Sequence, residues 1–144
     1  MTNLTHKAQE IFSHDLYATE STGVKIDEAR EGYARCSLSL TPLHRNAMGA
    51  VMGGVMFTLA DISFAIAANS YCLADNQPLQ WVSLNSSIHY LGQTQGNTLV
   101  AETICVKQGG STCVYTISIH DENDKPIAFV TTTGNKLNKV KSKN

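Results

Sequence analysis

The sequence predicts an α+β fold in which a strongly curved antiparallel sheet of five to six strands wraps around one long central helix. The 144 residues match the usual size of one domain, so we expect residues 1–144 to form a single unit. Residues 46 to 106 contain no Lys or Arg, and this stretch begins with a long apolar segment of helix-forming residues. Most of the remaining chain alternates apolar and polar residues as strands do. We therefore expect these strands to form a sheet that packs around the helix and buries it.

The chain is expected to open with a short helix over about residues 5–13. Thr5 belongs to the residue types that cap helix N-termini, and Ile11 and Phe12 provide apolar contacts. Such a helix covers a surface and does not build the core.

A hairpin is predicted from residue 23 to residue 40, with a turn at Glu31 and Gly32 between two alternating segments. Residues 42–49 combine Pro, His, Arg, Asn and Gly, which is typical of a loop. We expect His44 to be exposed in this loop.

Residues 52–72 predict the long helix, because they contain helix formers, no Pro and no broad polar stripe. Residues 51 to 74 carry a single charge, that of Asp61, so a membrane span has to be considered. An Asp near the centre of a bilayer helix costs about 2.5–3.5 kcal/mol, and Asn69 and the pair Gly53-Gly54 weaken that interpretation further. We therefore expect a helix buried in protein and no contact with a membrane.

Four further segments alternate with a period of two and predict antiparallel strands, largely in consecutive order, at residues 79–91, 99–107, 112–120 and 127–137. In the first of them, the alternation places Ser83 and His89 on the same face.

Charge and cysteine content exclude several functional classes. Charged residues make up 16% of the chain, below the roughly 25% of ordinary domains, and the net charge is -1, which is not typical of a nucleic-acid binder. The four cysteines show no metal-site or redox spacing, so we expect free thiols in a reducing cytoplasm. Charges in the first twenty residues are unlike a secretory signal.

Other sequence features predict no further chemistry. The basic end of the chain, about residues 136–144, is interpreted as a solvated tail, with an anion-binding patch as the less favoured alternative. The histidines are scattered without ligand spacing, so we predict no metal. Neither a phosphate loop, nor a dinucleotide motif, nor a Gly-x-Ser-x-Gly elbow occurs, and no cofactor is expected.

The entry into the long helix carries the most suggestive chemistry. Gly53 and Gly54 allow a ligand to approach the backbone, and the free amides of a first helical turn stabilise an oxyanion, although tight packing explains the glycines equally well. Asp61 is a carboxylate in apolar surroundings, where its pKa would rise and it would become a stronger base, unless backbone or serine donors hold it for structure alone. Eight residues of helix separate Gly53 from Asp61 by roughly 12 Å, so a shared site requires two subunits.

The residues that form a recognisable pattern are Asn46, Gly49, Gly53-Gly54, Leu59-Ala60-Asp61, Asn69 and Val82-Ser83. With this pattern the chain resembles the hotdog-fold acyl-CoA thioesterases of the phenylacetate-degradation type, from about residue 23 to residue 136. The resemblance implies a hotdog fold, thioester substrates, and a dimer or, more often, a homotetramer built as a dimer of dimers.

The resemblance also implies site roles. Asp61 matches the catalytic carboxylate, acting as general base or nucleophile, and Gly53 matches the residue whose amide polarises the thioester carbonyl. Asn46 matches the side chain that orients substrate or water, and Ser83 matches a hydroxyl that positions the attacking water.

One departure concerns substrate binding, since Met52 stands where many members have His. Met52, Gly54 and Phe57 are expected to contact the acyl group. For the coenzyme A phosphates the candidates are Lys107 and a lysine after the last strand, Lys136 or Lys139.

The leading hypothesis is hydrolysis of an acyl-CoA thioester at a dimer interface. The alternative is a hotdog protein that binds an acyl-CoA or similar ligand without hydrolysing it, which the Met52 departure favours. Hydratase chemistry would require a catalytic His paired with an acid, and none can be assembled around the helix.

Overall fold

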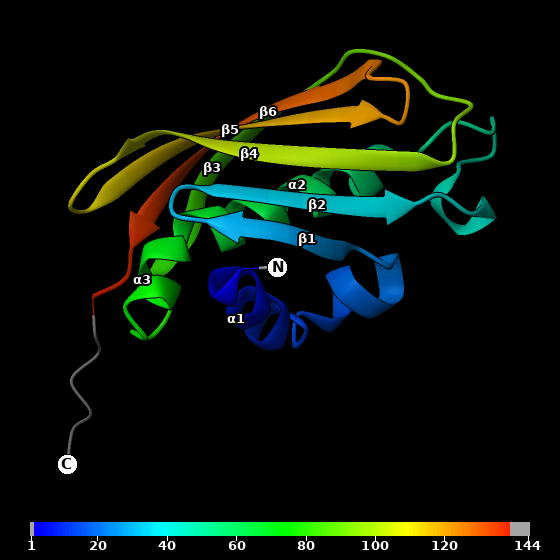
Figure 1. The fold of residues 1–144 in the computed structure, drawn as a ribbon. Helices are drawn as coiled ribbons and strands as arrows, with labels where there is room; N and C mark the ends of the chain where they lie inside the picture. The colour runs from blue at the N-terminus through cyan, green and yellow to red at the C-terminus, as the bar shows by residue number, and fades with distance from the viewer. Residues whose placement is uncertain (1, 139–144) are drawn as a thin grey trace.

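The computed structural model describes residues 2–138 and confirms the predicted α+β class. A six-stranded antiparallel sheet curls around one long helix, α2 (Gly53–Ala68), as Figure 1 shows. The sheet order is β1-β2-β4-β5-β6-β3. The strands are β1 (Lys25–Arg30), β2 (Tyr33–Ser39), β3 (Trp81–Tyr90), β4 (Thr98–Gln108), β5 (Thr112–Asp121) and β6 (Pro126–Lys136).

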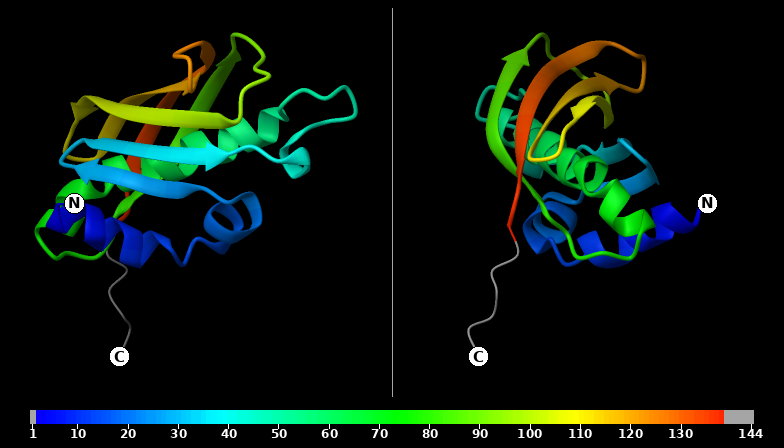
Figure 2. Two further views of the ribbon diagram at one scale, coloured as in Figure 1. Left: turned by 45° about the vertical axis from the view of Figure 1, so that its right-hand side comes forward. Right: turned by 90° about the vertical axis from the view of Figure 1, so that its left-hand side faces the viewer.

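β4, β5 and β6 are consecutive neighbours, as expected, whereas β3 does not lie beside β4. β4 pairs with β2, and β3 pairs with β6 at the far edge. The reason is α2, which crosses the concave side of the sheet between β2 and β3 and so delivers β3 to the edge opposite β1. In the right-hand view of Figure 2 the sheet curls over one side of α2, with β3 beside β6.

Irregular register bends the sheet. Shifts occur in the pairings β1–β2, β3–β6, β4–β5 and β5–β6. Each such bulge increases the local twist and bends its strand. Together they give a sheet curved enough to surround a helix.

The bulge in β3 decides which residues face the helix. Ser83 pairs with Gly134, whereas Asn85 pairs with Thr133, so Leu84 is the extra residue. Since directly opposed residues share a face, Ser83 and Tyr90 point to the helix side, while Asn85 and His89 point outward. The expectation that Ser83 and His89 share one face is therefore wrong.

The predicted helix at residues 52–72 is interrupted at Asn69. α2 ends at Ala68, and a short helix, α3 (Ser70–Ala74), follows in a new direction. The core side of α2 is tightly packed, and Phe64 meets Tyr115 of β5 edge to face at 5.7 Å between ring centroids. Within residues 2–138 no helix has both the length and the apolar composition needed to cross a membrane.

α2 is not covered on every side in the single chain. Gly54 and Asp61 are exposed, and Thr58 and Ala65 are half-buried. Their spacing places them on one face, and we call these four residues the open side of α2. Thr58 and Asp61 are the polar members of this narrow face, which agrees with the expectation that the helix has no broad polar stripe.

The N-terminal helix, α1 (Asn3–Phe12), begins earlier than predicted, and its cap is Thr2 instead of Thr5. Thr5 is 1% exposed, and its hydroxyl both donates to the Ala29 carbonyl and accepts from the Ala29 amide. Phe12 is buried as expected, but Ile11 is 42% exposed. Thr5 therefore joins α1 to the edge strand β1, where an unpaired backbone would otherwise remain.

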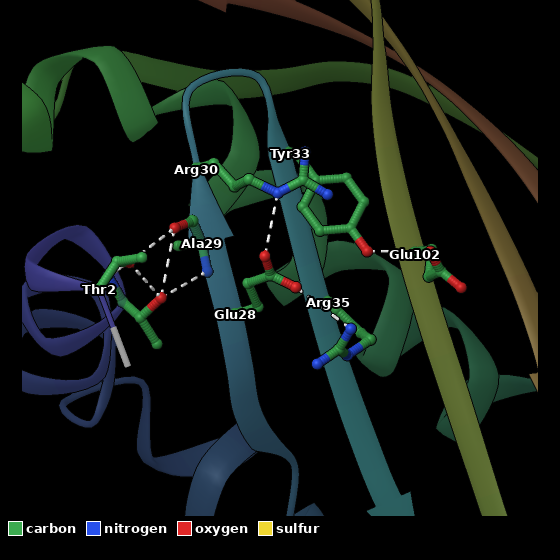
Figure 3. A network of polar contacts seen from close by, with 8 residues as sticks. Thr2, Glu28, Ala29, Arg30, Tyr33, Arg35 and Glu102 are labelled. Carbon is green, nitrogen blue, oxygen red and sulfur yellow. Dashed lines mark hydrogen bonds and ion pairs between the residues drawn. The ribbon is translucent and has the colours of Figure 1, made fainter.

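Charged side chains gather on the outer face of β1, β2 and β4, away from α2, as Figure 3 shows. Glu28 pairs with Arg30 at 3.0 Å and with Arg35 at 3.2 Å. Arg30 lies 3.8 Å from the ring centroid of Tyr33, whose hydroxyl donates to Glu102. Exposed pairs of this kind contribute little stability each, and they keep this face of the sheet polar.

Candidate functional site

The loop that leads into α2 is an ordered turn. The side-chain carbonyl of Asn46 accepts hydrogen bonds from the amides of Met48 (2.9 Å) and Ala50 (3.1 Å). Gly49 has a φ of 80°, a left-handed conformation that favours glycine. Asn46 thus shapes this loop through its oxygen, and its side-chain NH₂ group, which has no acceptor within residues 2–138, can meet a ligand.

Arg45 fixes the same loop to a distant segment. Its guanidinium donates to the carbonyls of Gly49, Thr94 and Gly96. In the left view of Figure 2 the loop at residues 45–52 extends past the end of the sheet. Arg45 therefore stabilises a projecting loop that few apolar contacts could hold.

His44 is buried, with 4% of its surface exposed, so the expected exposed loop residue is wrong. Its Nδ1 accepts from the Thr41 amide at 3.0 Å, which leaves Nε2 to donate to the Thr22 carbonyl at 2.7 Å. Its own carbonyl accepts from the Met52 amide at 2.9 Å. His44 thereby joins the segment before β1 to the residue that precedes α2.

Sequence reasoning missed this role, although a signal was present. Thr41-Pro42, three and two residues before His44, is a helix-start pattern, and the structure forms a short 3₁₀ helix, η2 (Pro42–His44), with a capping box between Thr41 and His44.

The start of α2 presents unused backbone donors. Met52 is the N-cap residue and provides no side-chain cap. Within residues 2–138 the amides of Gly53 and Gly54 have no hydrogen-bond acceptor. Because the positive end of the helix dipole lies at the same point, this backbone favours a developing negative charge.

Tyr90, the last residue of β3, packs directly on Gly53. A Cβ atom added to Gly53 would lie 2.7 Å from the Tyr90 hydroxyl oxygen and 2.9 Å from its Cζ. β3 runs antiparallel to α2, so its end reaches the helix start. Tyr90 could not be identified from the sequence, because an alternating pattern does not show which helix residue a strand residue contacts.

Asp61 lies on the open side of α2, two turns after Gly53. It lines an open pocket of about 310 Å³ together with Asp15, Tyr17 and Thr58. Removal from water raises the pKa of the Asp61 carboxyl group, and the negative charge of Asp15 raises it further. Among the residues that the structure describes, no Lys or Arg lines the pocket, so Asp61 has the environment of a base and not that of a salt-bridge partner.

A second pocket, of about 210 Å³, lies next to the first at the start of α2. Tyr17, His44, Met52 and Gly54 contribute to its lining. Tyr17 lines both pockets, belongs to the π-helical turn η1 (Tyr17–Thr22), and is 73% exposed. Gly54 and Asp61 thus border neighbouring pockets on one side of the helix.

The structure groups some of the predicted site residues and separates others. Asn46, Met52, Gly53 and Gly54 lie together at the start of α2, and the half-buried Phe57 follows one turn later. Eight residues of continuous helix put Asp61 roughly 12 Å from Gly53. Ser83 lies on the concave side of β3, opposite Gly134 and near Phe64.

The two lysines suggested for phosphate binding lie at the other end of the molecule. Lys136 pairs with Trp81, whose amide bonds to Asn69 at the end of α2. Lys107 lies near the β4–β5 turn and pairs with Val114. The 16 residues of α2, about 24 Å of helix, separate that end from Gly53 in the same chain. β6 includes Lys136, which was expected in the tail, and residues 139–144 of the predicted tail, with Lys139, lie outside the described residues.

Other reactive groups do not form an alternative centre in the part of the chain that the structure describes. No three His, Cys, Asp or Glu side chains there could hold a metal ion. All four cysteines are free thiols, and burial raises the pKa of Cys36 to about 12. Cys36 therefore stays protonated and is not a nucleophile.

The chain is similar to known proteins in both sequence and structure. Residues 48–128 match the model of the thioesterase superfamily. The chain is 32% identical over 131 residues to the acyl-coenzyme A thioesterase PaaI of Escherichia coli, which covers 88% of this chain and 89% of that protein.

Two solved structures share the fold. The E. coli PaaI protein from the phenylacetic acid degradation operon has a TM-score of 0.79 and 29% identity, covering 94% of this chain and 97% of that one. A hypothetical thioesterase protein with coenzyme A from Streptococcus pneumoniae has a TM-score of 0.78 and 25% identity, covering 92% of this chain and 99% of that one.

Proposed function

The chain belongs to the thioesterase superfamily, and from this membership we propose that it hydrolyses an acyl-CoA thioester to a free acid and coenzyme A. One observation carries the proposal. The free amide of Gly53 and the pocket of Asp61, which no Lys or Arg among the described residues lines, are suited to act as an oxyanion site and a base, the two elements that thioester hydrolysis requires. The E. coli relative is named an acyl-coenzyme A thioesterase, and the S. pneumoniae structure contains coenzyme A, which agrees with this substrate class.

In the proposed mechanism the Gly53 amide donates a hydrogen bond to the thioester carbonyl oxygen. Asp61 takes a proton from water while the water oxygen bonds to the carbonyl carbon, and the negative charge collects on the oxygen held by Gly53. The C–S bond then breaks, and the proton passes to the coenzyme A thiolate. Asp61 attacking as a nucleophile, with water then cleaving the resulting anhydride, gives the same products.

Two polar side chains, those of Asn46 and Ser83, assist the proposed hydrolysis. The NH₂ group of Asn46 orients the substrate, since its carbonyl oxygen is already used by the loop. Ser83 positions the attacking water from the concave side of β3. Met52, Gly54 and Phe57 contact the acyl group at the start of α2.

We further propose that each site combines Gly53 of one protomer with Asp61 of the partner subunit. The separation of about 12 Å within one chain prevents both from acting on the same carbonyl. β3 is an edge strand with exposed apolar residues, Val82 at 42% and Leu84 at 65%, and antiparallel pairing with its own copy about a two-fold axis would continue the sheet. Two such dimers then form the tetramer.

In such an assembly, Lys107 and Lys136 of a neighbouring subunit bind the coenzyme A phosphates. Within one protomer both lysines lie at the end of the molecule opposite Gly53. The free thiols agree with a reducing compartment, and we propose the cytoplasm.

Replacement of Asp61 by Asn tests the proposed function. The amide is isosteric with the carboxyl group but does not accept a proton, so kcat should fall by about 10²-fold or more while the oligomer stays intact. The measurement is release of coenzyme A thiol from aromatic, short-chain and long-chain acyl-CoAs, with the size of the particle determined by light scattering.

The exposed residue Asp75, outside the site, provides the matched control, and Asp75→Asn should hydrolyse the same substrates at the wild-type rate. Unchanged turnover in Asp61→Asn would remove Asp61 from the mechanism. If the wild-type protein binds a non-hydrolysable acyl-CoA analogue tightly in calorimetry but releases no thiol from any acyl-CoA, the protein is a binding protein, as the Met52 departure suggests, and the hydrolase proposal is wrong.

A further inference from the structure

The hydroxyl group of Tyr90 lies close to the Gly53 amide, and this distance can be bounded. The Tyr90 oxygen is 2.7 Å from the position of a Cβ atom on Gly53. A Cβ position lies about 2.5 Å from its own backbone nitrogen in standard geometry. The Tyr90 oxygen and the Gly53 nitrogen are therefore at most about 5 Å apart.

Two donors at this separation can bind the same oxygen atom. Each donor lies roughly 3 Å from an oxygen that it holds, so donors up to about 6 Å apart can share one acceptor. The Gly53 amide and the Tyr90 hydroxyl meet this condition without any movement of the backbone.

The Tyr90 hydroxyl is also available for a ligand. It makes no hydrogen bond with the residues that the structure describes, and the side chain is 54% exposed. Two other tyrosines use their hydroxyls within the protein, since Tyr33 donates to Glu102 at 2.9 Å and Tyr115 donates to Gln108 at 2.6 Å.

Met52, the adjacent residue of the loop, supplies no comparable donor. A thioether is at best a weak acceptor, and a phenolic hydroxyl is a good donor at neutral pH. Tyr90 is therefore the strong side-chain donor that the fold places beside the Gly53 amide.

We propose that Tyr90 is a catalytic residue whose hydroxyl donates a second hydrogen bond to the thioester carbonyl oxygen, beside the Gly53 amide. This inference rests on the proposed hydrolase function and adds to it a residue for which no role was expected. The hydrogen bond strengthens as the carbonyl oxygen gains negative charge, so it acts mainly on the transition state.

The test is steady-state hydrolysis by the Tyr90→Phe variant, which keeps the aromatic ring on Gly53 and removes one exposed oxygen. We expect kcat to fall about 10- to 100-fold, since loss of an oxyanion donor has effects of this order or larger. KM should change by less than about threefold, because the bond matters little in the ground state. The melting temperature should remain that of the wild type.

Tyr71→Phe is the matched control, because the Tyr71 hydroxyl packs on another glycine, 2.9 Å from a Cβ position on Gly32, at the opposite end of the molecule. This variant should keep the wild-type kcat. Tyr90→Phe with an unchanged kcat, or with a raised KM alone, overturns the role of Tyr90 while leaving the hydrolase function intact. Absence of hydrolysis by the wild type overturns both together.

Discussion

The carboxyl group of Asp61 is held in a state that costs stability at neutral pH. Its pKa in the folded chain is raised by removal from water and by Asp15, whereas in the unfolded chain it returns to about 4. Because the folded pKa is raised, the fold favours the protonated carboxyl group. The contribution of this group to the free energy of unfolding is complete below the unfolded pKa and is lost as the pH rises through the folded pKa. At neutral pH the ionised group therefore destabilises the fold.

We expect Asp61→Asn to melt at a higher temperature than the wild type at pH 7, because the amide removes this charge. The difference should shrink as the pH is lowered and disappear below about pH 4, where the wild-type carboxyl group is protonated. Thermal unfolding followed by circular dichroism across this range provides the measurement.

Asp75→Asn, on an exposed turn, should show no such rise, which separates a local effect from a change in net charge. A lower melting temperature for Asp61→Asn at pH 7 would mean that the carboxylate stabilises the fold, contrary to the environment described here.

At the level of single residues, the sequence identified the groups whose chemical type is unusual for their surroundings. Asp61 in an apolar helix and the glycine pair before it could be singled out from composition and spacing. His44 and Tyr90 could not, because their roles depend on Thr22 and Gly53, to which they are brought only by the tertiary fold. The role of a residue can be inferred from the sequence only where the residues that it contacts are close to it in the sequence.

Among the elements, the junction between α2 and β3 depends on one side chain. Asn69 is 2% exposed, and its oxygen accepts from the amides of Gln80 and Trp81. Its NH₂ group donates to the carbonyls of Ala65 and Trp81. Asn69 therefore ends the helix and holds the first residue of the strand that returns along it.

Asn69→Ala should lower the free energy of unfolding by about 3 kcal/mol or more, since buried backbone groups left without a partner cost about 1–3 kcal/mol each. Urea unfolding at a fixed protein concentration gives this value. Asn85→Ala, on the exposed outer face of the same strand, should change it by less than about 0.5 kcal/mol. Equal effects of the two substitutions would show that Asn69 does not hold the junction.

The elements themselves were largely predictable, while their interruptions were not. All six strands coincide with predicted segments to within a few residues, because alternation and turn residues are local properties. The end of α2 at Asn69 and the bulge at Leu84 were missed, since the hydrogen bonds and pairings that cause them join distant residues. Because of that bulge, Ser83 and His89 point to opposite faces of the sheet. A local irregularity in one strand therefore changes which side chains can reach the candidate site.

For the whole molecule, the proposed sharing of each site between two subunits has a direct test in mixed dimers. One parent is Asp61→Asn, and the other is Gly53→Pro, which removes the proposed donor at the first helical position, where proline is tolerated. Dimers with one chain of each kind contain one site with both defects and one intact site. Purified mixed dimers should therefore regain about half the wild-type turnover, although each parent is nearly inactive.

Gly53→Ala is the control for the Cβ atom that proline adds. Like proline, alanine displaces the Tyr90 side chain, but it keeps the backbone N–H at this position. It should retain more activity than Gly53→Pro. If the mixed dimers are as inactive as their parents, Gly53 and Asp61 act within one chain, and the shared site is wrong.

The fold class could be predicted because the long apolar helix required a cover and the chain offered only strands. The order of the strands could not be predicted, since it depends on the path of α2 across the sheet. The assembly of subunits is still a prediction, supported by the free edge of β3 and by the length of helix between Gly53 and Asp61.

The pairing of β3 with β6 also determines when during biosynthesis the site can form. The partner of β3 is β6, and Ser83 pairs with Gly134 near the end of the sequence. β3 therefore stays unpaired in a nascent chain until β6, the last strand, has left the ribosome. Until then nothing in the sheet holds Tyr90 against Gly53, and an extended segment with apolar side chains is exposed to other chains. The end of the protein that carries the proposed site is thus completed last, and β3 is the strand of a newly made chain that waits longest for its partner.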